Sequence, residues 1–349
     1  MRFGHFFYPM VFDDSNDARA IDQCMFEAEL VEELGFDAIW FAEHHFTGEV
    51  VYGDPLMLAS AMASRTKRVL LGFGIVEMAL HHPVRLAIQT ALLDNLSHGR
   101  LIVGTGRGAT YNTFEYVGFG TTPAQGVEQL REAEDLLVTA WTKDEVHYEG
   151  KYWQVSFPSV RPRPYQKPHP PLPRACIDDN NIMEMARSGR PLLYRGRTNS
   201  DLARVFTLYA DTMREAGFSE EQVESCLDQC WVWREAYLAE SDNQALDEFI
   251  PAFVGATKHL IGIQERWNPK DIAMPAQTVP LDRDGYGREP DPESPQQLVG
   301  SPRRVADQIA ALRDAGVRNL MLTHRSLMPR EKVVASLRLL SEQVAPKFR

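Results

Sequence analysis

The regular alternation of strand-like and helix-like segments constrains the fold of this chain more than any other feature of its sequence. Short apolar runs such as Phe3–Tyr8 and Asp37–Phe41 read as strands, and longer stretches such as Ala18–Leu34 carry apolar residues at helical spacing. About eight strands that alternate with helices fit a parallel sheet. No strand is followed by the glycine fingerprint of a doubly wound dinucleotide-binding fold. At 349 residues, the sequence therefore predicts an α/β fold, a TIM-like (β/α)8 barrel.

The expected elements follow from periodicity and from glycine and proline stop signals. The expected strands are Phe3–Tyr8, Asp37–Phe41, Val69–Val76, Leu101–Thr105, Pro173–Ile177, Pro191–Arg195, Gln229–Ala239 and Val317–Thr323. The expected helices are Ala18–Leu34, Leu58–Arg65, Val84–Leu96, Val127–Trp141, Ser200–Glu215, Asn243–Ile263, Pro302–Ala315 and Glu331–Val344.

Two segments interrupt this alternation. In residues 144–173, Glu145–Tyr148 and Tyr152–Phe157 flank a Glu-Gly pair and predict a hairpin, and seven prolines then exclude a helix. Residues 264–299 are polar and rich in Pro, Gly and Asp, which favours a mobile active-site loop. We therefore expect one barrel domain over 1–349, with insertions after the fourth strand and before the last helix–strand unit.

Charge and composition exclude several classes of function. The 37 Lys and Arg against 48 Asp and Glu give a net charge of −11 without a basic cluster, which argues against nucleic-acid binding. No apolar run approaches the roughly 18 residues of a membrane span, and we expect a cytoplasmic protein without a secretory leader. The four cysteines include only one close pair, so we expect free thiols and no zinc site.

Titratable residues follow the second and third expected strands, where barrel enzymes place their active sites. Glu43, His44 and His45 suit proton transfer near neutral pH, but the two histidines could equally hydrogen-bond structurally. Because neighbouring residues on a strand face opposite sides, at most one of the two histidines points straight into the barrel mouth. His81 and His82 make a metal site conceivable, although they could simply begin the next helix.

Later strand ends carry groups that suit an anion. Gly106, Arg107 and Gly108 follow the fourth strand, where glycines allow close backbone approach and the arginine can bind a phosphate. Asp178, Asp179 and Asn180 begin a helix after the fifth strand, and capping of that helix is the simpler interpretation. Tyr194 ends the sixth strand, with Arg195 and Arg197 beside it. Trp231 and Trp233 alternate along the seventh, where core packing is the commoner role.

Taken together, these motifs resemble the bacterial luciferase-like family of flavin-dependent monooxygenases, and luciferase alpha-type chains in particular. The matching segments occur in the family's order over nearly the whole chain. They are MRFGHF at 1–6, ELGFDAIW at 33–40, EHHF at 43–46, HPVR at 82–85, LDNLSHGR at 93–100, GTGRG at 104–108, VGSP at 299–302 and LRDAGV at 312–317.

The resemblance implies a two-component monooxygenase that binds reduced FMN at the C-terminal mouth of the barrel. A separate NAD(P)H:flavin reductase would supply the FMNH2, and dioxygen would give a flavin C4a-hydroperoxide that oxidises a small organic substrate. The oxidation could be hydroxylation, Baeyer–Villiger insertion, epoxidation or aldehyde oxidation. The family commonly forms dimers, so we expect a homodimer. The aromatic residues near the strand ends predict an apolar substrate.

The resemblance also implies roles for individual residues. His44 matches the catalytic histidine, and residues 264–294 match the mobile lid. The expected cofactor-binding residues are Gly74, Ile75, Gly106, Arg107, Gly108, Asp178, Asp179, Asn180 and Tyr194, with a cis peptide between the first two. The expected substrate pocket comprises Phe6, Glu43, His45, Trp231 and Trp233.

One departure from the family and two alternative functions remain. The family usually offers small hydroxyl residues to the flavin phosphate where this chain has Asp178 and Asp179, and carboxylates repel a phosphate. The first alternative is an F420-dependent oxidoreductase of the same barrel superfamily. The second is a non-catalytic flavin-binding partner subunit.

Overall fold

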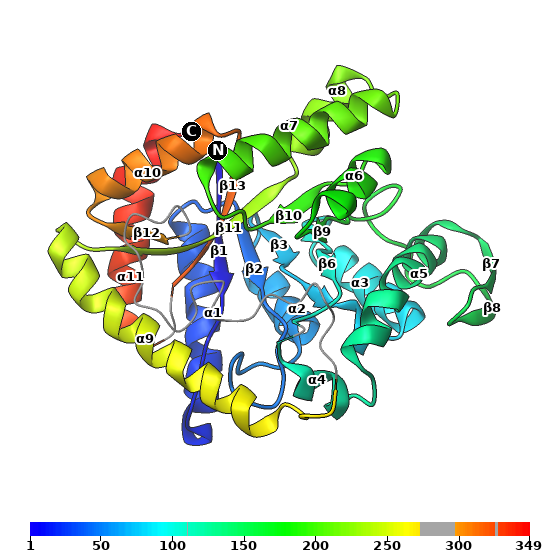
Figure 1. Ribbon diagram of the computed structural model, residues 1–349, viewed down its shortest axis with the longest axis horizontal. Helices are drawn as coiled ribbons and strands as arrows, with labels where there is room; N and C mark the ends of the chain where they lie inside the picture. The colour runs from blue at the N-terminus through cyan, green and yellow to red at the C-terminus, as the bar shows by residue number, and fades with distance from the viewer. Residues whose placement is uncertain (110, 273–296, 325–326) are drawn as a thin grey trace.

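The computed structural model describes residues 1–109, 111–272, 297–324 and 327–349, and shows a central parallel sheet surrounded by helices (Figure 1). The strands of this sheet are β1 (Arg2–Phe7), β2 (Ala38–Phe41), β3 (Leu70–Phe73), β4 (Val76–Glu77), β5 (Leu101–Ile102), β6 (Thr105–Gly106), β9 (Arg174–Ala175), β10 (Leu192–Tyr194), β11 (Trp231–Leu238), β12 (Gln297–Gly300) and β13 (Asn319–Thr323).

The sheet closes into the predicted barrel. Its strands pair in the order β4-β6-β9-β10-β11-β13-β1-β2-β3-β5, and β12 pairs with β11 outside this path. Two residues separate β3 from β4 and two separate β5 from β6, so each pair is one interrupted strand. The β3–β5 and β4–β6 pairings are therefore two parts of one parallel contact, which joins the two ends of the order. The path forms a closed parallel barrel, in agreement with the predicted (β/α)8 architecture.

The helices cover the outside of the barrel and follow the strands in the predicted alternation (Figure 1). They are α1 (Asp17–Glu33), α2 (Pro55–Arg65), α3 (Pro83–Leu96), α4 (Thr113–Gly118), α5 (Pro123–Thr142), α6 (Asp179–Arg187), α7 (Asn199–Glu215), α8 (Glu220–Leu227), α9 (Asp242–Trp267), α10 (Pro302–Asp314) and α11 (Arg330–Leu339). Proline stands in the first turn of α2, α3, α5 and α10, where its missing N–H costs no hydrogen bond.

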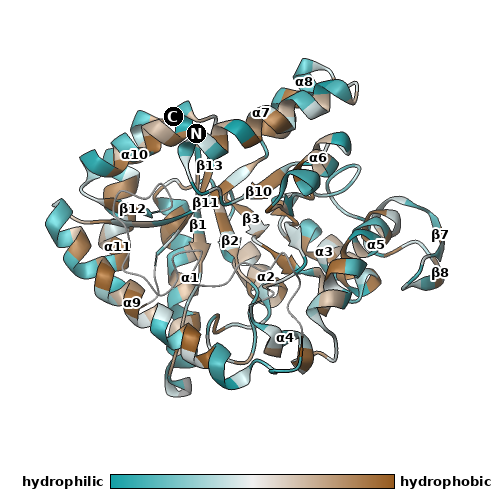
Figure 2. Ribbon diagram, in the orientation of Figure 1, coloured by the Kyte–Doolittle hydropathy of each residue, from teal (hydrophilic) through white to brown (hydrophobic). Residues whose placement is uncertain are grey.

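Strand alternation divides the apolar residues between the barrel interior and the layer beneath the helices. Phe3 and Phe7 of β1 belong to the outer cluster with the helix residues, whereas Phe6 packs inside the barrel with Trp40 and Trp231. The hydrophobic colour accordingly concentrates on the central strands, while the surrounding helices alternate between hydrophilic and hydrophobic residues (Figure 2). Gly72 makes room for the Trp40 ring, because a Cβ atom there would lie 2.5 Å from it.

The structure corrects several expected boundaries. Helices α4 and α8 were not expected, because both are short and carry too few apolar residues to show a clear period. Residues 264–267 continue α9 and residues 297–299 belong to β12, whereas 273–296 lie outside the described residues. The last expected helix changes to a π-turn at Leu340–Val344. The expected cis peptide between Gly74 and Ile75 is present.

The segment after α5 forms the predicted hairpin. Strands β7 (Glu145–Glu149) and β8 (Gln154–Pro158) pair in antiparallel fashion, and no helix occurs between Pro158 and Pro173. All four cysteines are free. Within the described ranges, no helix combines the length and apolar character that crossing a lipid bilayer requires.

Candidate active site

A cavity of about 300 Å³ opens at the C-terminal ends of the barrel strands. Aromatic side chains and buried acidic and imidazole groups form its wall. The lining includes Phe6, Tyr8, Glu43, His44, Gly74, Ile75, Glu77, Gly108, Tyr111, Tyr194, Arg195, Trp233 and Met321. We call this space the central cavity.

A second cavity of about 290 Å³ adjoins the central cavity. The two share Ile75, Gly108, Ala109, Tyr111, Ala175 and Ile177 in their lining. The second cavity adds three arginines, Arg107, Arg131 and Arg174, and we call it the arginine cavity. Arg174 and Arg131 also pair with Glu184, at 2.8 Å and 2.6 Å. An apolar, aromatic space thus continues into a basic one.

The loop between the two cavities requires glycine. Gly108 has a φ of +100°, and a Cβ atom there would lie 2.5 Å from the Tyr116 hydroxyl oxygen. That hydroxyl donates a hydrogen bond to the Arg107 carbonyl at 2.7 Å. Tyr116 therefore fixes the loop backbone that carries Arg107 and leaves no room for a side chain at residue 108.

His44 lies in the wall of the central cavity with a carboxylate facing each ring nitrogen. Nδ1 is 3.4 Å from Oε1 of Glu115, and Nε2 is 3.7 Å from Oε1 of Glu49. Asn112 links these partners, because its Nδ2 donates to Glu49 at 2.7 Å and to Glu115 at 3.4 Å, and its Oδ1 accepts from Gln264 at 3.0 Å. The side chain is thus held by the loop after β2, by α4 and, through Asn112, by the end of α9.

These carboxylates determine the charge of His44. Burial alone would lower the pKa of the imidazole, but chiefly the Glu49 and Glu115 carboxylates raise it to about 10. The raised pKa favours the imidazolium form at neutral pH, in which both ring nitrogens carry a proton and act as hydrogen-bond donors.

Glu43 contacts two further imidazole groups, those of His81 and His45, beside the cavity. Its Oε1 lies 2.7 Å from Nε2 of His81 and 3.3 Å from Nε2 of His45, and its Oε2 accepts the backbone N–H of Glu77 at 2.7 Å. Burial would raise the pKa of this carboxyl, but His81 and His45 lower it to about 2. Glu43 is thus an ionised residue that anchors the end of β4.

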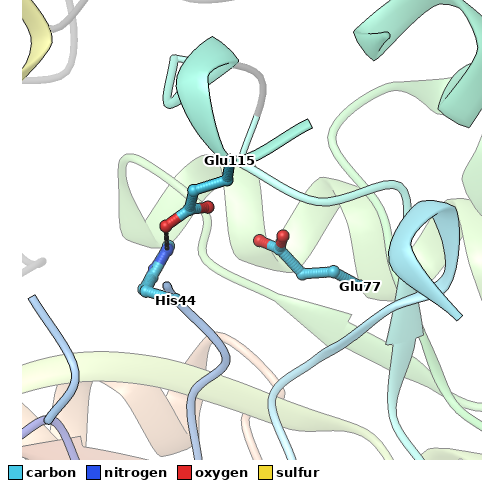
Figure 3. Close-up of side chains that lie close together, drawn as sticks. All are labelled: His44, Glu77 and Glu115. Atoms are coloured by element: carbon cyan, nitrogen blue, oxygen red, sulfur yellow. Dashed lines mark ion pairs between the residues drawn. The ribbon is translucent and has the colours of Figure 1, made fainter. Parts of the chain in front are cut away.

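His44, Glu77 and Glu115 come together from three different elements (Figure 3). One donor atom of each lies within 4.8 Å of the others, and all three side chains are buried. Imidazole and carboxylate groups at this spacing are potential ligands for a divalent cation. They are equally able to share protons.

The structure brings together most of the residues predicted from the sequence. The central cavity is lined by Phe6, Glu43, His44, Gly74, Ile75, Gly108, Tyr194 and Trp233, and the arginine cavity by Gly106 and Arg107. As expected for adjacent residues, His44 faces the central cavity and His45 does not.

Two predicted pocket residues lie elsewhere. His45 contacts Glu43 and packs edge-on against Phe119, with ring centroids 4.7 Å apart. Trp231 is buried inside the barrel against Trp40, with ring centroids 5.1 Å apart. It precedes Trp233 by two residues on β11, so it faces the same side of the strand but lies about 6.6 Å deeper along it.

The predicted cofactor contacts after the fifth strand also differ. Asp178, Asp179 and Asn180 line neither cavity. Asp178 caps α6 by accepting the backbone N–H of Asn181 at 2.9 Å, and Asp179 pairs with Arg204 at 2.9 Å. Helix capping, the simpler interpretation of this sequence, is confirmed for Asp178. The neighbouring Asn181 does line the arginine cavity.

Sequence reasoning missed four residues around His44: Glu49, Glu77, Asn112 and Glu115. One signal was available for Glu77, because it follows the third expected strand as Glu43 follows the second. Glu115 and Asn112 belong to α4 and its first turn, which sequence periodicity did not reveal. Glu49 lies in an irregular loop, where no pattern predicts side-chain direction.

Two characterised relatives share sequence with this chain. The oxygenase component of flavin-dependent trigonelline monooxygenase from Acinetobacter baylyi is 31% identical over 182 residues, which is 52% of this chain and 50% of that protein. The chain thus matches about half the length of this relative. Limonene 1,2-monooxygenase from Rhodococcus erythropolis is 25% identical over 99% of this chain and 86% of its own length.

The fold is shared with a solved monooxygenase, RslO1 from Streptomyces bottropensis, at a TM-score of 0.84 and 26% identity over the whole of both chains. The model of the luciferase-like monooxygenase family matches residues 1–319. With this match over most of its length, the chain belongs to the luciferase-like monooxygenase family.

Proposed function

We propose that this chain is a flavin-dependent monooxygenase that uses reduced FMN and dioxygen to oxidise an apolar small organic molecule. The observation that carries the proposal is the continuity between the central cavity, with His44 in its wall, and the arginine cavity. FMN has the same division into an aromatic ring system and a phosphate-bearing tail. Reduced flavin, when bound, supplies the electrons that activate dioxygen.

The arginine cavity fits a phosphate group. Arg107 projects from the loop that Tyr116 fixes, and Asp178 is close enough to influence the pKa of its guanidinium. Arg107 therefore offsets part of the negative charge that Asp178 places near this cavity. Arg131 adds a second positive charge and donates to Asn181 Oδ1 at 3.1 Å.

The aromatic lining of the central cavity suits an isoalloxazine ring and an apolar substrate. Phe6, Tyr8, Tyr194 and Trp233 contribute rings, and Ile75 separates this space from Gly106. His44 is the group in this wall that we assign to proton transfer. Its Nε2 lies 3.7 Å from Glu49, beyond hydrogen-bond distance, and is the ring nitrogen that we assign to proton donation toward oxygen atoms bound in the cavity.

The source of the reduced flavin is part of the proposal. The relative from Acinetobacter baylyi is named as an oxygenase component, which supports a separate NAD(P)H:flavin reductase as functional partner. We expect a homodimer, which light scattering on the purified protein tests.

An anaerobic titration tests the cofactor. Photoreduced FMN is added to the flavin-free protein without oxygen, and reduced F420 is added to a parallel sample. We expect saturable binding of reduced FMN and weaker binding of F420. Exclusive binding of F420 would instead identify an F420-dependent oxidoreductase. Binding of FMN without oxidation of any substrate in a screen would identify a non-catalytic partner subunit.

A further inference from the structure

The carboxyl groups of Glu77 and Glu115 face one another beside His44. Both side chains are buried, with 2% and 0% of their surface exposed. Figure 3 shows the second oxygen of Glu115 turned toward the Glu77 carboxyl group, while its first oxygen contacts His44. The two residues come from α4 and β4, so the fold, rather than the local sequence, brings them together.

One oxygen of each carboxyl group is fully engaged. Oε1 of Glu77 accepts the backbone N–H of Ala109 at 3.0 Å. Oε1 of Glu115 accepts the backbone N–H of His45 at 2.8 Å and contacts Nδ1 of His44. These bonds hold both groups in place.

The other oxygen of each carboxyl group is buried without a partner. Among the residues that the structure describes, neither Oε2 of Glu77 nor Oε2 of Glu115 makes a hydrogen bond. A buried, unpaired carboxylate oxygen is costly, and two such carboxylates side by side are more so. A proton on one of the two groups removes this cost, because it cancels one charge and supplies a donor.

We propose that Glu77 and Glu115 hold one proton between them, mainly on Glu77, and that this pair positions His44 through the contact between Glu115 and Nδ1. Glu115 then remains the charged partner of the imidazolium, and Glu77 is a neutral acid behind it. The assignment of Glu77 as a positioning residue for catalysis rests on the proposed function. The shared proton does not depend on that function.

The charged and titratable groups around the pair favour this distribution. Around His44 and the pair lie Tyr8, Glu43, Glu49 and Tyr116, and the Tyr116 hydroxyl donates to the Arg107 carbonyl. Burial raises the pKa of Glu77 well above its ordinary value, Glu115 and Glu43 raise it further, and His44 opposes them. Glu115 is closer than Glu77 to the positive charge of His44, because Oε1 of Glu115 contacts Nδ1 of the imidazole ring.

The contacts of His44 argue against a metal ion at these three residues. Both ring nitrogens face a carboxylate oxygen, and a proton on each nitrogen would satisfy these contacts and leave no lone pair for a cation. Oε1 of Glu115 already accepts the His45 N–H. We therefore treat metal binding as an outcome that the experiment must exclude.

Infrared spectroscopy of the flavin-free protein tests the shared proton directly. At pH 7.5 (about neutral, where an unperturbed carboxyl group is ionised) the wild-type protein should show a carboxylic-acid C=O band that shifts in D2O. Glu77→Gln should remove this band, and Glu27→Gln should retain it. Glu27 is the matched control, because it is also buried beside a histidine, at 3.2 Å from His5, but lies outside the cluster.

The titration of His44 provides a second measurement without flavin. In protein labelled at histidine, His44→Gln identifies the His44 signal by its loss. Glu115→Gln should lower the His44 midpoint by about one pH unit or more. Glu77→Gln should change it by less than about half a unit, because an amide replaces a neutral acid.

Three results would overturn the proposal. The first is an infrared spectrum of the wild-type protein that lacks a carboxylic-acid band. This test does not depend on whether any variant folds. The second is a fall in the His44 midpoint in Glu77→Gln as large as that in Glu115→Gln, because Glu77 would then carry the charge. The third is a stoichiometric metal in the purified protein that both variants lose. Failure of monooxygenase assays alone would affect only the proposed function.

Discussion

At the scale of single residues, a place in the candidate site could be predicted for residues whose motif follows the end of an expected strand. Glu43, His44 and Arg107 follow strands, so the barrel topology alone directs them to one end of the sheet. The charge of His44 could not be predicted, because Glu49 and Glu115 reach it from a loop and from an unexpected helix. These carboxylates favour the protonated imidazolium form of His44, whereas the ordinary pKa of histidine is compatible with either the acid or the base.

Replacement of His44 tests its role in proton transfer. His44→Ala should reduce product formation by about 10²-fold or more, the usual loss for a removed proton-transfer group, with nearly unchanged affinity for reduced FMN. Turnover and anaerobic binding measure the two effects separately. His82→Ala is the control, because His82 is exposed and makes no side-chain cap at α3. Equal losses in both variants would refute the assignment.

Replacement of Arg107 tests the phosphate site. Arg107→Ala should weaken binding of reduced FMN by about 1.5–3 kcal/mol, the loss of a hydrogen bond to a charged group. Riboflavin, which lacks the phosphate, should bind both proteins with similar affinity. Arg187→Ala on the exposed face of α6 serves as the control, because the Arg187 guanidinium contacts the Met183 sulfur of the same helix. An equal loss for riboflavin would place the phosphate elsewhere.

At the scale of elements, the sequence predicted the long periodic helices and the strands but missed the short helices that support the site. Helix α4 carries Glu115 with only six residues, too few for a clear period. Helix α6 was expected from its acidic start, and its Asp178 side chain caps it as predicted. The same carboxylate lies near Arg107, so capping and cofactor binding make opposing demands at this position.

Substitution of Asp178 separates these demands. Asp178→Ser keeps a side chain that caps helices well but removes the negative charge, so it should tighten FMN binding with little change in unfolding free energy. Asp178→Ala should also lose about 0.5–2 kcal/mol of stability. Asp179→Ser is the control, because Asp179 pairs with Arg204 at 2.9 Å and lines neither cavity. Unchanged FMN affinity in Asp178→Ser would separate this residue from the phosphate site.

At the scale of the whole molecule, a buried ion-pair cluster joins three parts of the barrel wall. Oε2 of Glu134 on α5 contacts Arg174 of β9 at 2.5 Å and Arg190, just before β10, at 2.7 Å. Thr105 of β6 donates to Oε1 of Glu134 at 2.5 Å. No sequence pattern predicted this cluster, because its members are separated along the chain by a hairpin and a proline-rich segment.

Loss of Glu134 should destabilise the barrel strongly. Glu134→Gln removes the negative charge that both Arg174 and Arg190 contact in the barrel wall, and we expect a loss of about 3–5 kcal/mol in unfolding free energy. Urea denaturation measures it. Glu128→Gln, on the same helix but exposed, should change the free energy by less than about 1 kcal/mol. Similar small effects of both substitutions would show that the cluster contributes little.

The pH dependence of stability should reflect His44. Its folded pKa of about 10 lies above the unfolded value of roughly 6.5, so its stabilisation is complete below the unfolded value and is lost as the pH rises through 10. The difference in unfolding free energy between wild type and His44→Gln should therefore decrease as the pH rises from about 7, near the unfolded pKa, to about 10, near the folded pKa. A constant difference would contradict the raised pKa.

The most direct test of the central claim is the reaction of the preformed complex with oxygen. The protein is mixed anaerobically with reduced FMN, then rapidly with aerated buffer, and the return of the oxidised-flavin absorbance is followed. If the cavity controls oxygen activation through His44, reoxidation in the wild-type protein should differ clearly in rate from that of free reduced FMN, and His44→Ala should change it. Reoxidation at the rate of free flavin in both proteins would contradict the account.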